Sequence, residues 1–212
     1  RGTDRHGQTR AILELLILTA TRSGEIRGMC WREVNFETST WTIPAERMKA
    51  QQLHRVPLSK RARDILDKQR GQHDTLVFPS PRDQVVLSDM VLTSFLRRVK
   101  AVSDTPGRVA TAHGFRSSFR DWCSEHGYPR DLAERALAHT ISNKVEAAYH
   151  RTDLLEQRRP MMVVWAEYCV GDSDKIDSLT KQGLWNSLSN IGKARGEREK
   201  QGEATIAGFE SD

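Results

Sequence analysis

Six side chains suited to phosphoryl transfer are spread along the first 150 residues of the chain. They are two arginines, two histidines, a lysine and a tyrosine, namely Arg22, Lys49, His113, Arg116, His139 and Tyr149. Guanidinium groups can present planar forks of donors to the non-bridging oxygens of a phosphodiester. A preorganised donor of this kind contributes about 3–4 kcal/mol to transition-state stabilisation. The set therefore predicts attack on a phosphodiester by a tyrosine hydroxyl, with no metal ion or nucleotide cofactor.

The order and spacing of these residues resemble the catalytic domain of the tyrosine recombinases, the phage integrases. The residues lie in four short segments followed by the tyrosine: Thr21–Glu25, Arg47–Lys49, His113–Arg116, Leu137–His139 and, ten residues later, Tyr149. The stretch Asn143–Arg151 is most similar to the nucleophile segment of integrases from satellite phages, prophages and genomic islands. The resemblance covers approximately residues 10–170.

The resemblance implies that Arg22 stabilises the charge on the non-bridging oxygens, and it implies a role for each of the other five residues. Tyr149 would attack the phosphate and form a 3′-phosphotyrosine ester, which a DNA hydroxyl can later reverse without ATP. Lys49 would donate a proton to the leaving 5′ oxygen as a general acid. His113 and Arg116 stand three residues apart, so in a helix both would project toward one phosphate. His139 would hydrogen-bond the same phosphate, and Glu25 is interpreted as a structural partner of a nearby arginine.

Several of these assignments have competitors of the same residue type. Lys49 competes with Lys60 and Arg47 as the mobile cation, and it could instead be a solvated turn lysine. The tyrosine has two rivals, Tyr128 and Tyr168, which the surrounding residues place in packing positions. Either histidine of the set could be a helix cap or a core residue. The run Arg97–Lys100 is open to two interpretations, as DNA-backbone contacts or as charges complementing a helix C-terminus.

The composition favours a polyanionic partner. Lysine and arginine number 33 against 28 acidic residues, a net charge of +5. Residues 171–212 hold 6 of the basic and 8 of the acidic residues, so the positive charge belongs to the segment with the motifs. Three widely separated cysteines indicate neither a disulfide scaffold nor a zinc site, and suit a reducing cytoplasm. No signal peptide is visible, and the longest apolar run is far short of the roughly 20 residues that span a bilayer.

The elements that must position the candidate residues are predicted to be mainly helical. Two β-prone runs, Thr40–Pro44 and His54–Leu58, flank the polar turn Glu46–Gln52 and predict a hairpin. The helices are expected at Ala11–Ala20, Gly24–Cys30 with Ser23 as cap, Lys60–Arg70 after Ser59, Asp89–Val102 after Ser88, Ala112–Glu125, Pro129–Ala138 and Asn143–His150. A last helix, capped by Asp153, should run toward Tyr168 with a kink or restart at Pro160. The fold class is therefore α+β, mainly α-helical with a small antiparallel β-sheet.

We expect residues 1–10 to be the end of a linker, 11–170 a catalytic domain, and 171–212 a polar tail that is disordered or contacts another protomer. The resemblance implies a site-specific recombinase that integrates or excises a mobile element at double-stranded DNA attachment sites. It further implies a homotetramer on DNA, accessory DNA-bending and excision proteins, and no cofactor. The alternatives are a DNA-relaxing enzyme of the type IB topoisomerase class and a non-catalytic DNA-binding regulator.

Overall fold

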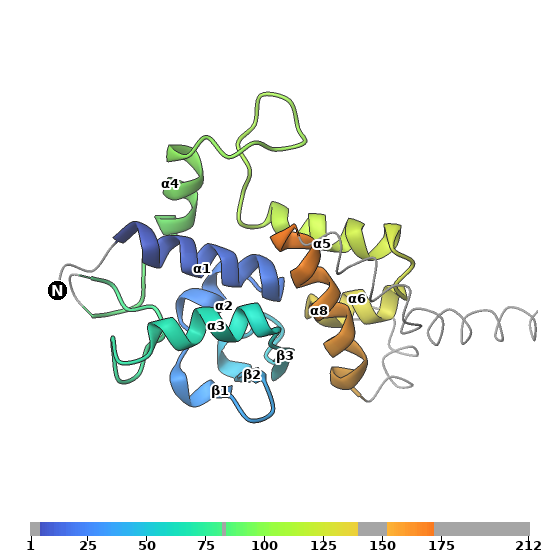
Figure 1. The fold of residues 1–212 in the computed structure, drawn as a ribbon, viewed down its shortest axis with the longest axis horizontal. Helices are drawn as coiled ribbons and strands as arrows, with labels where there is room; N and C mark the ends of the chain where they lie inside the picture. The colour runs from blue at the N-terminus through green and yellow to red at the C-terminus, as the bar shows by residue number, and fades with distance from the viewer. Residues whose placement is uncertain (1–4, 82–83, 140–151, 172–212) are drawn as a thin grey trace, which may run out of the picture. The chain divides into compact units, whose positions relative to one another are not determined.

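The computed structural model describes residues 5–81, 84–139 and 152–171 (Figure 1). The helices are α1 Arg5–Thr19, α2 Ser23–Arg27, α3 Lys60–Gln69, α4 Met90–Arg98, α5 Gly114–Glu125, α6 Arg130–Ala136 and α8 Leu155–Val170. The strands are β1 Val34–Asn35, β2 Thr40–Ile43 and β3 His54–Pro57, and two 3-10 turns are η1 Trp31–Glu33 and η2 Ala45–Arg47. The described residues up to Cys169 belong to one compact unit, whose boundary lies between Cys169 and Val170. None of the described helices is long and apolar enough to cross a membrane.

The three strands form one antiparallel sheet in the order β1-β2-β3. Trp41 of β2 pairs with Val34 on one side and with Val56 on the other. Both Trp41 and Val56 are buried, so this sheet face is held against the core. The predicted hairpin is thereby confirmed, whereas β1, only two residues long, gave no sequence signal. The connection between β2 and β3 contains η2 and then Lys49.

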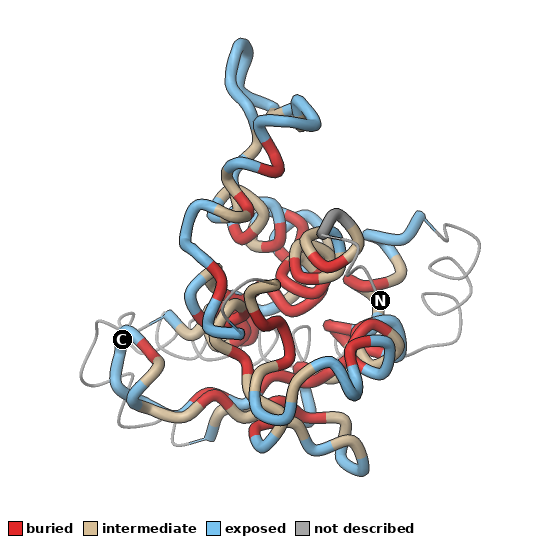
Figure 2. The backbone as a smooth tube through the Cα atoms, turned by 90° about the vertical axis from the view of Figure 1, so that its left-hand side faces the viewer, coloured by how far each residue is buried: buried red, intermediate tan, exposed pale blue. Residues whose placement is uncertain are grey.

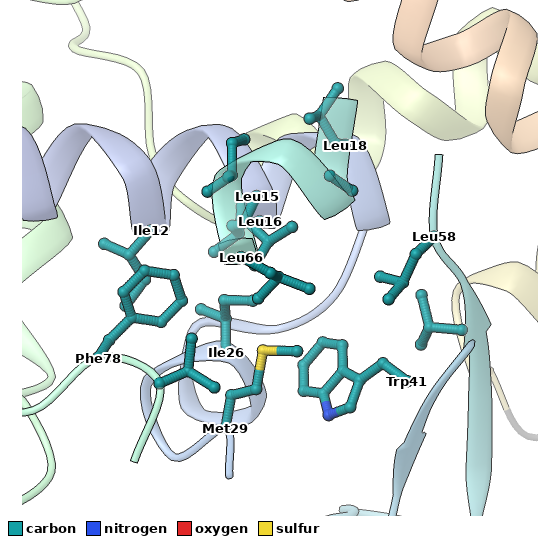
Figure 3. Packing of buried hydrophobic residues seen from close by; sticks show 14 of the residues in the cluster. Ile12, Leu15, Leu16, Leu18, Ile26, Met29, Trp41, Leu58, Leu66 and Phe78 are labelled. Carbon is teal, nitrogen blue, oxygen red and sulfur yellow. The ribbon is translucent and has the colours of Figure 1, made fainter. Parts of the chain in front are cut away.

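The first core lies around α1, which packs between α3 and α4 (Figure 1). Ile12, Leu15 and Leu16 are fully buried and face Trp41 and Phe78 from other elements (Figure 3). The prediction of a buried helix here is confirmed. The helix nevertheless begins at Arg5, six residues before the expected start. The polar first turns are stabilised by tertiary contacts, since the buried Gln8 donates a hydrogen bond from Nε2 to the Pro79 carbonyl at 3.0 Å.

The second core is formed by α5, α6 and α8 at the C-terminal end of α1. The indole Nε1 of Trp165 donates to the Ile17 carbonyl at 2.8 Å, which joins α8 to α1. The expected restart at Pro160 is wrong, because α8 is one helix from Leu155 to Val170, whereas the expected kink at that residue stays a prediction. Proline costs that helix one backbone hydrogen bond. The burial of the adjacent Met161 and Met162 in this core offsets the loss.

The capping predictions have mixed outcomes. Ser59 caps α3, accepting from the Ala62 N–H at 3.3 Å, and Asp153 accepts from the Leu155 N–H at 3.3 Å at the start of α8. Ser23 is not a cap, because α2 begins at Ser23 itself and Arg22 is the N-cap residue. The predicted helix Asn143–His150 lies outside the described residues.

The connection from α4 to α5 is exposed along most of its length and projects from the rest of the unit (Figure 2). It begins four residues earlier than predicted, because α4 ends at Arg98 and Lys100 then adopts a positive φ of 50°. An antiparallel bridge between Val102 and Val109 holds its two limbs together. The returning limb leads directly to His113 and α5.

Candidate functional site

Arg22 is fixed by a buried carboxylate one turn further along the chain. Its backbone N–H donates to Oε2 of Glu25 and its Nη1 to Oε1, both at 2.8 Å. Glu25 is only 3% exposed, so it neutralises one edge of the guanidinium inside the fold. The Nη2 of Arg22 lies 3.4 Å from the Ala138 carbonyl, in the loop after α6. The interpretation of Glu25 as a structural partner of an arginine agrees with this geometry.

Arg116 joins two loops that are distant in sequence. From α5 its Nη1 donates to the Ala20 carbonyl after α1, and its Nη2 donates to the Leu137 carbonyl after α6 at 2.6 Å. The side chain is buried, and its Nε has no hydrogen-bond partner among the described residues. Burial, reinforced by the charge of nearby Arg22, lowers the pKa of Arg116 to about 10. The two arginines are therefore neighbours at the junction of the same two loops.

His139 follows Leu137 and Ala138 and is held to the end of α6 twice. Its backbone N–H donates to the Glu134 carbonyl at 3.0 Å, and its Nδ1 lies 2.5 Å from Oε2 of the same residue. The other carboxylate oxygen of Glu134 accepts from Nε of Arg120 at 2.7 Å. Burial acts to raise the pKa of the Glu134 carboxyl, but the hydrogen bonds from Arg120 and His139 outweigh it and lower that pKa. The result is a hydrogen-bonded chain of three side chains, Arg120, Glu134 and His139.

Three of the six candidate residues line one cavity of about 440 Å³. The described residues around it are Arg22, Lys49, Ala50, Glu134, Ala138 and His139. They come from the loop before α2, the connection between β2 and β3, and the end of α6 with its following loop. Two cations, Arg22 and Lys49, and the imidazole of His139 thus come from three separate segments and surround a space large enough for a phosphate group. In the part of the chain that the structure describes, no group of three His, Cys, Asp or Glu residues could hold a metal ion.

The structure separates Lys49 from its two competitors. Arg47 is pinned by Glu33, whose carboxylate oxygens both lie 2.5 Å from Nη1, and by the Glu25 carbonyl at Nη2. Lys60 pairs with Asp64 at 3.0 Å on the exposed side of α3. Lys49 is exposed and lines the cavity. Its position is thus the one that suits a mobile proton donor.

None of the described contacts joins His113 or Tyr149 to the residues that line the cavity. His113 is the exposed residue before α5, and its carbonyl accepts from the Arg116 N–H at 3.0 Å. It is not among the described residues that line the cavity. Tyr149 lies outside the described residues, so its position relative to the cavity stays a prediction.

The two rival tyrosines belong to an aromatic cluster around Trp122. The ring centroid of Tyr128 lies 5.2 Å from that of Trp122, and the centroid of Tyr168 lies 6.0 Å from it. Burial raises the pKa of Tyr128 to about 12, which disfavours its phenolate. Neither tyrosine is among the described residues that line the cavity. Their packing supports the structural interpretation of both.

Sequence reasoning missed Glu134 and Arg120. Glu134 stands five residues before His139, and Arg120 stands one helical turn after Arg116. Those spacings were the available signal, since each places a charged side chain near a motif residue. Charged residues on exposed helix faces are common, however, and the spacing did not distinguish these two from solvated charges.

Comparisons with known proteins agree with this geometry. Residues 4–155 match the family model described as the phage integrase family. The chain is 39% identical over 162 residues to prophage integrase IntA of Escherichia coli K12, covering 75% of this chain and 38% of that protein. It is 37% identical over 188 residues to the integrase of Enterobacteria phage P4, covering 81% and 42%. The chain spans about two fifths of the length of these relatives.

Two solved structures share the fold. The integrase of mycobacterium phage Brujita aligns with a TM-score of 0.56 at 22% identity, over 77% of this chain and 52% of that one. The XerH site-specific recombinase, solved in a pre-cleavage complex with its difH substrate, aligns with a TM-score of 0.54 at 18% identity, over 71% and 48%. The predicted mainly helical α+β fold is thereby confirmed.

Proposed function

Because the chain belongs to the phage integrase family, we propose that it is the catalytic part of a tyrosine site-specific recombinase that integrates or excises a mobile genetic element. The observation that carries this proposal is the cavity where Arg22, Lys49 and His139 converge beside Arg116. A site of this charge suits the scissile phosphate of DNA. The net charge of +5 is consistent with such a polyanionic substrate.

The proposed reaction exchanges one phosphate ester for another. The phenol oxygen of Tyr149 forms a bond to phosphorus, and the bond from phosphorus to the 5′ oxygen breaks. Arg22 stabilises the charge that develops on the non-bridging oxygens, and Lys49 gives a proton to the leaving 5′ oxygen. Arg116 acts beside Arg22, and His113 takes up the proton that the phenol loses as its oxygen attacks phosphorus. A 5′ hydroxyl can reverse these steps, so strands are rejoined without ATP.

The proposed partners follow from the same chemistry. We propose double-stranded DNA attachment sites as substrates, a homotetramer on paired duplexes, and accessory DNA-bending and excision proteins. The XerH recombinase, which shares the fold, was solved with its DNA substrate, and this supports a DNA partner here. A DNA substrate of this kind lies in the cytoplasm, which we propose as the location of the protein.

Trapping on a nicked suicide substrate tests the proposal. The nick releases a short fragment after cleavage, so the protein should remain covalently attached to the DNA. Tyr149→Phe should abolish the adduct, whereas Tyr128→Phe and Tyr168→Phe should retain it. Absence of an adduct with the unmodified chain would favour a DNA-binding regulator. Relaxation of supercoiled DNA without strand transfer between duplexes would favour a topoisomerase.

A further inference from the structure

We propose that Arg47 is a positioning residue that sets where Lys49 stands relative to Arg22 at the cavity. This role rests on the proposed function, in which Lys49 gives a proton to the leaving 5′ oxygen. Misplacing a reacting group by about 1 Å can cost about a hundredfold in rate. Lys49 is exposed on the connection between β2 and β3, so the contacts that hold this connection decide where its ammonium group can reach.

The guanidinium of Arg47 joins this connection to η1 and to α2. Its Nη1 donates to both carboxylate oxygens of Glu33, each at 2.5 Å, and its Nη2 donates to the Glu25 carbonyl. The Glu25 carboxylate in turn holds Arg22 through two hydrogen bonds of 2.8 Å. Glu25 therefore binds one cation of the cavity through its carboxylate. Through its carbonyl it binds a residue two positions before the other cation.

Glu33 is itself held by the core, so it gives Arg47 a fixed point of attachment. Glu33 is buried, and its Oε2 accepts from the indole Nε1 of Trp41 at 3.0 Å and from the Cys30 N–H at 3.2 Å. Trp41 is fully buried in β2. Because the carboxylate cannot move with the connection, its ion pair with Arg47 restrains the connection.

The residue between Arg47 and Lys49 adds an apolar anchor. Met48 is buried and belongs to the first core. Its N–H donates to the Ala45 carbonyl at 3.0 Å, and its carbonyl accepts from the Gln51 N–H at 3.0 Å. The backbone on both sides of Lys49 is therefore held. The side chain of Lys49 is exposed at the cavity, which leaves its ammonium group free to meet a leaving oxygen.

Gly28, which follows α2, leaves the space that Arg47 occupies. A Cβ at Gly28 would lie 3.1 Å from Nη2 of Arg47 and 3.4 Å from its Cζ and Nε. The backbone of Gly28 has a φ of −94°, which an L-residue can adopt. Alanine at this position would therefore press on the guanidinium without straining the backbone and without changing any charge.

Single-turnover cleavage of two nicked suicide substrates, with oxygen or sulfur at the bridging 5′ position, separates positioning from a general loss of structure. When the bond to phosphorus breaks, its electron pair goes to the leaving atom; oxygen then needs the proton of Lys49, whereas a thiolate leaves without one. Arg47→Lys keeps a cation for Glu33, but its single nitrogen cannot reproduce the fork that also reaches the Glu25 carbonyl. This variant should slow the oxygen substrate by up to about a hundredfold and leave the rate of the sulfur substrate unchanged.

Two more variants make this comparison decisive. Gly28→Ala should slow the oxygen substrate selectively, to a smaller extent. Arg61→Lys, the same substitution in an exposed ion pair with Glu14, should change neither rate. Equal slowing of both substrates by Arg47→Lys, or an unchanged rate of the oxygen substrate, would overturn the proposal. If Arg47→Lys does not fold, the same two outcomes in Gly28→Ala overturn it.

Hydrogen exchange followed by mass spectrometry tests the attachment without an activity assay. The N–H groups of Met48 and Gln51 should exchange about tenfold faster in Arg47→Lys, because losing a hydrogen bond from a charged group eases local opening. Arg61→Lys should leave these exchange rates unchanged, and equally slow exchange in Arg47→Lys would refute the attachment. If the unmodified chain cleaves neither substrate, the proposed function fails, while the exchange rates still decide whether Arg47 holds the connection.

Discussion

His54 should make the stability of the protein fall in mild acid. It lies in β3 opposite Ile43 and is 7% exposed. Burial, together with the positive charges of Arg158 and Arg116, lowers the pKa of His54 to about 3, although Asp153 acts in the opposite direction. The folded protein thus excludes a proton that the unfolded chain readily takes up.

The sign and size of the effect follow from this difference in pKa. Above the unfolded value of about 6.5 both states hold a neutral imidazole and the full stability is present. Below it, the unfolded state binds one more proton, and the free energy of unfolding decreases by about 1.4 kcal/mol per pH unit until the folded pKa is reached. At about pH 5 the loss should be roughly 2 kcal/mol. The lowered pKa values of Glu134 and Asp153 act only at more acidic pH.

Urea unfolding followed by circular dichroism at about pH 7 and about pH 5 measures this loss. The acid dependence should disappear over this range in His54→Gln, whose side chain does not titrate. His113→Gln removes an exposed histidine and should keep the dependence. If the unmodified chain and His54→Gln lose the same stability between the two pH values, the reasoning from burial is refuted.

Three more predictions concern the cations. Lys49→Ala should slow cleavage about 10²- to 10⁴-fold. A substrate with sulfur at the bridging 5′ position should restore the cleavage rate, because a thiolate leaves without a proton. Equal slowing of both substrates in single-turnover kinetics would contradict the general-acid role. Arg97 and Arg108 line one cavity beyond α4, and replacing both by Gln should reduce the slope of log affinity against log salt by about 2 if each contacts a phosphate. An unchanged slope would leave them as solvated charges. Arg47→Met should destabilise the fold by about 3–5 kcal/mol in urea unfolding, because Glu33 would stay buried without its cation. A loss below about 1 kcal/mol would contradict a stabilising ion pair between Arg47 and Glu33.

Matched variants separate these effects from general charge loss. Lys60→Ala removes a lysine whose partner Asp64 is on the exposed face of α3, so cleavage should be unaffected. Arg61→Met breaks an exposed pair with Glu14 and should cost no more than about 1 kcal/mol.

The parts of the fold that the sequence predicted are those with a local cause. The cap at Ser59, the β-prone runs around Lys49 and the buried face of α1 each depend on residues close together in the chain. The restart at Pro160 was wrong because burial of neighbouring side chains in α8, a tertiary effect, outweighs the local preference of proline. The start of α1 was missed for a similar reason, since Gln8 is stabilised by a carbonyl 71 residues away.

The candidate site likewise has features that the sequence predicted and features that depend on tertiary contacts. Motif spacing predicted that Arg22 and Arg116 act together, but it did not show what holds them. That depends on backbone carbonyls presented by tight turns, at which Ala20 and Ala138 adopt positive φ values of 51° and 48° without a glycine to mark them. The contact of Glu134 with His139 likewise depends on how the chain turns after α6.

A crystal structure of the chain bound to a nicked duplex would test the central claim most directly. We predict that the scissile phosphate lies in the cavity, with its oxygens within about 3 Å of donor nitrogens of Arg22 and Lys49 and with Tyr149 facing phosphorus. A phosphate bound elsewhere on the protein, with this cavity filled only by solvent, would contradict the account.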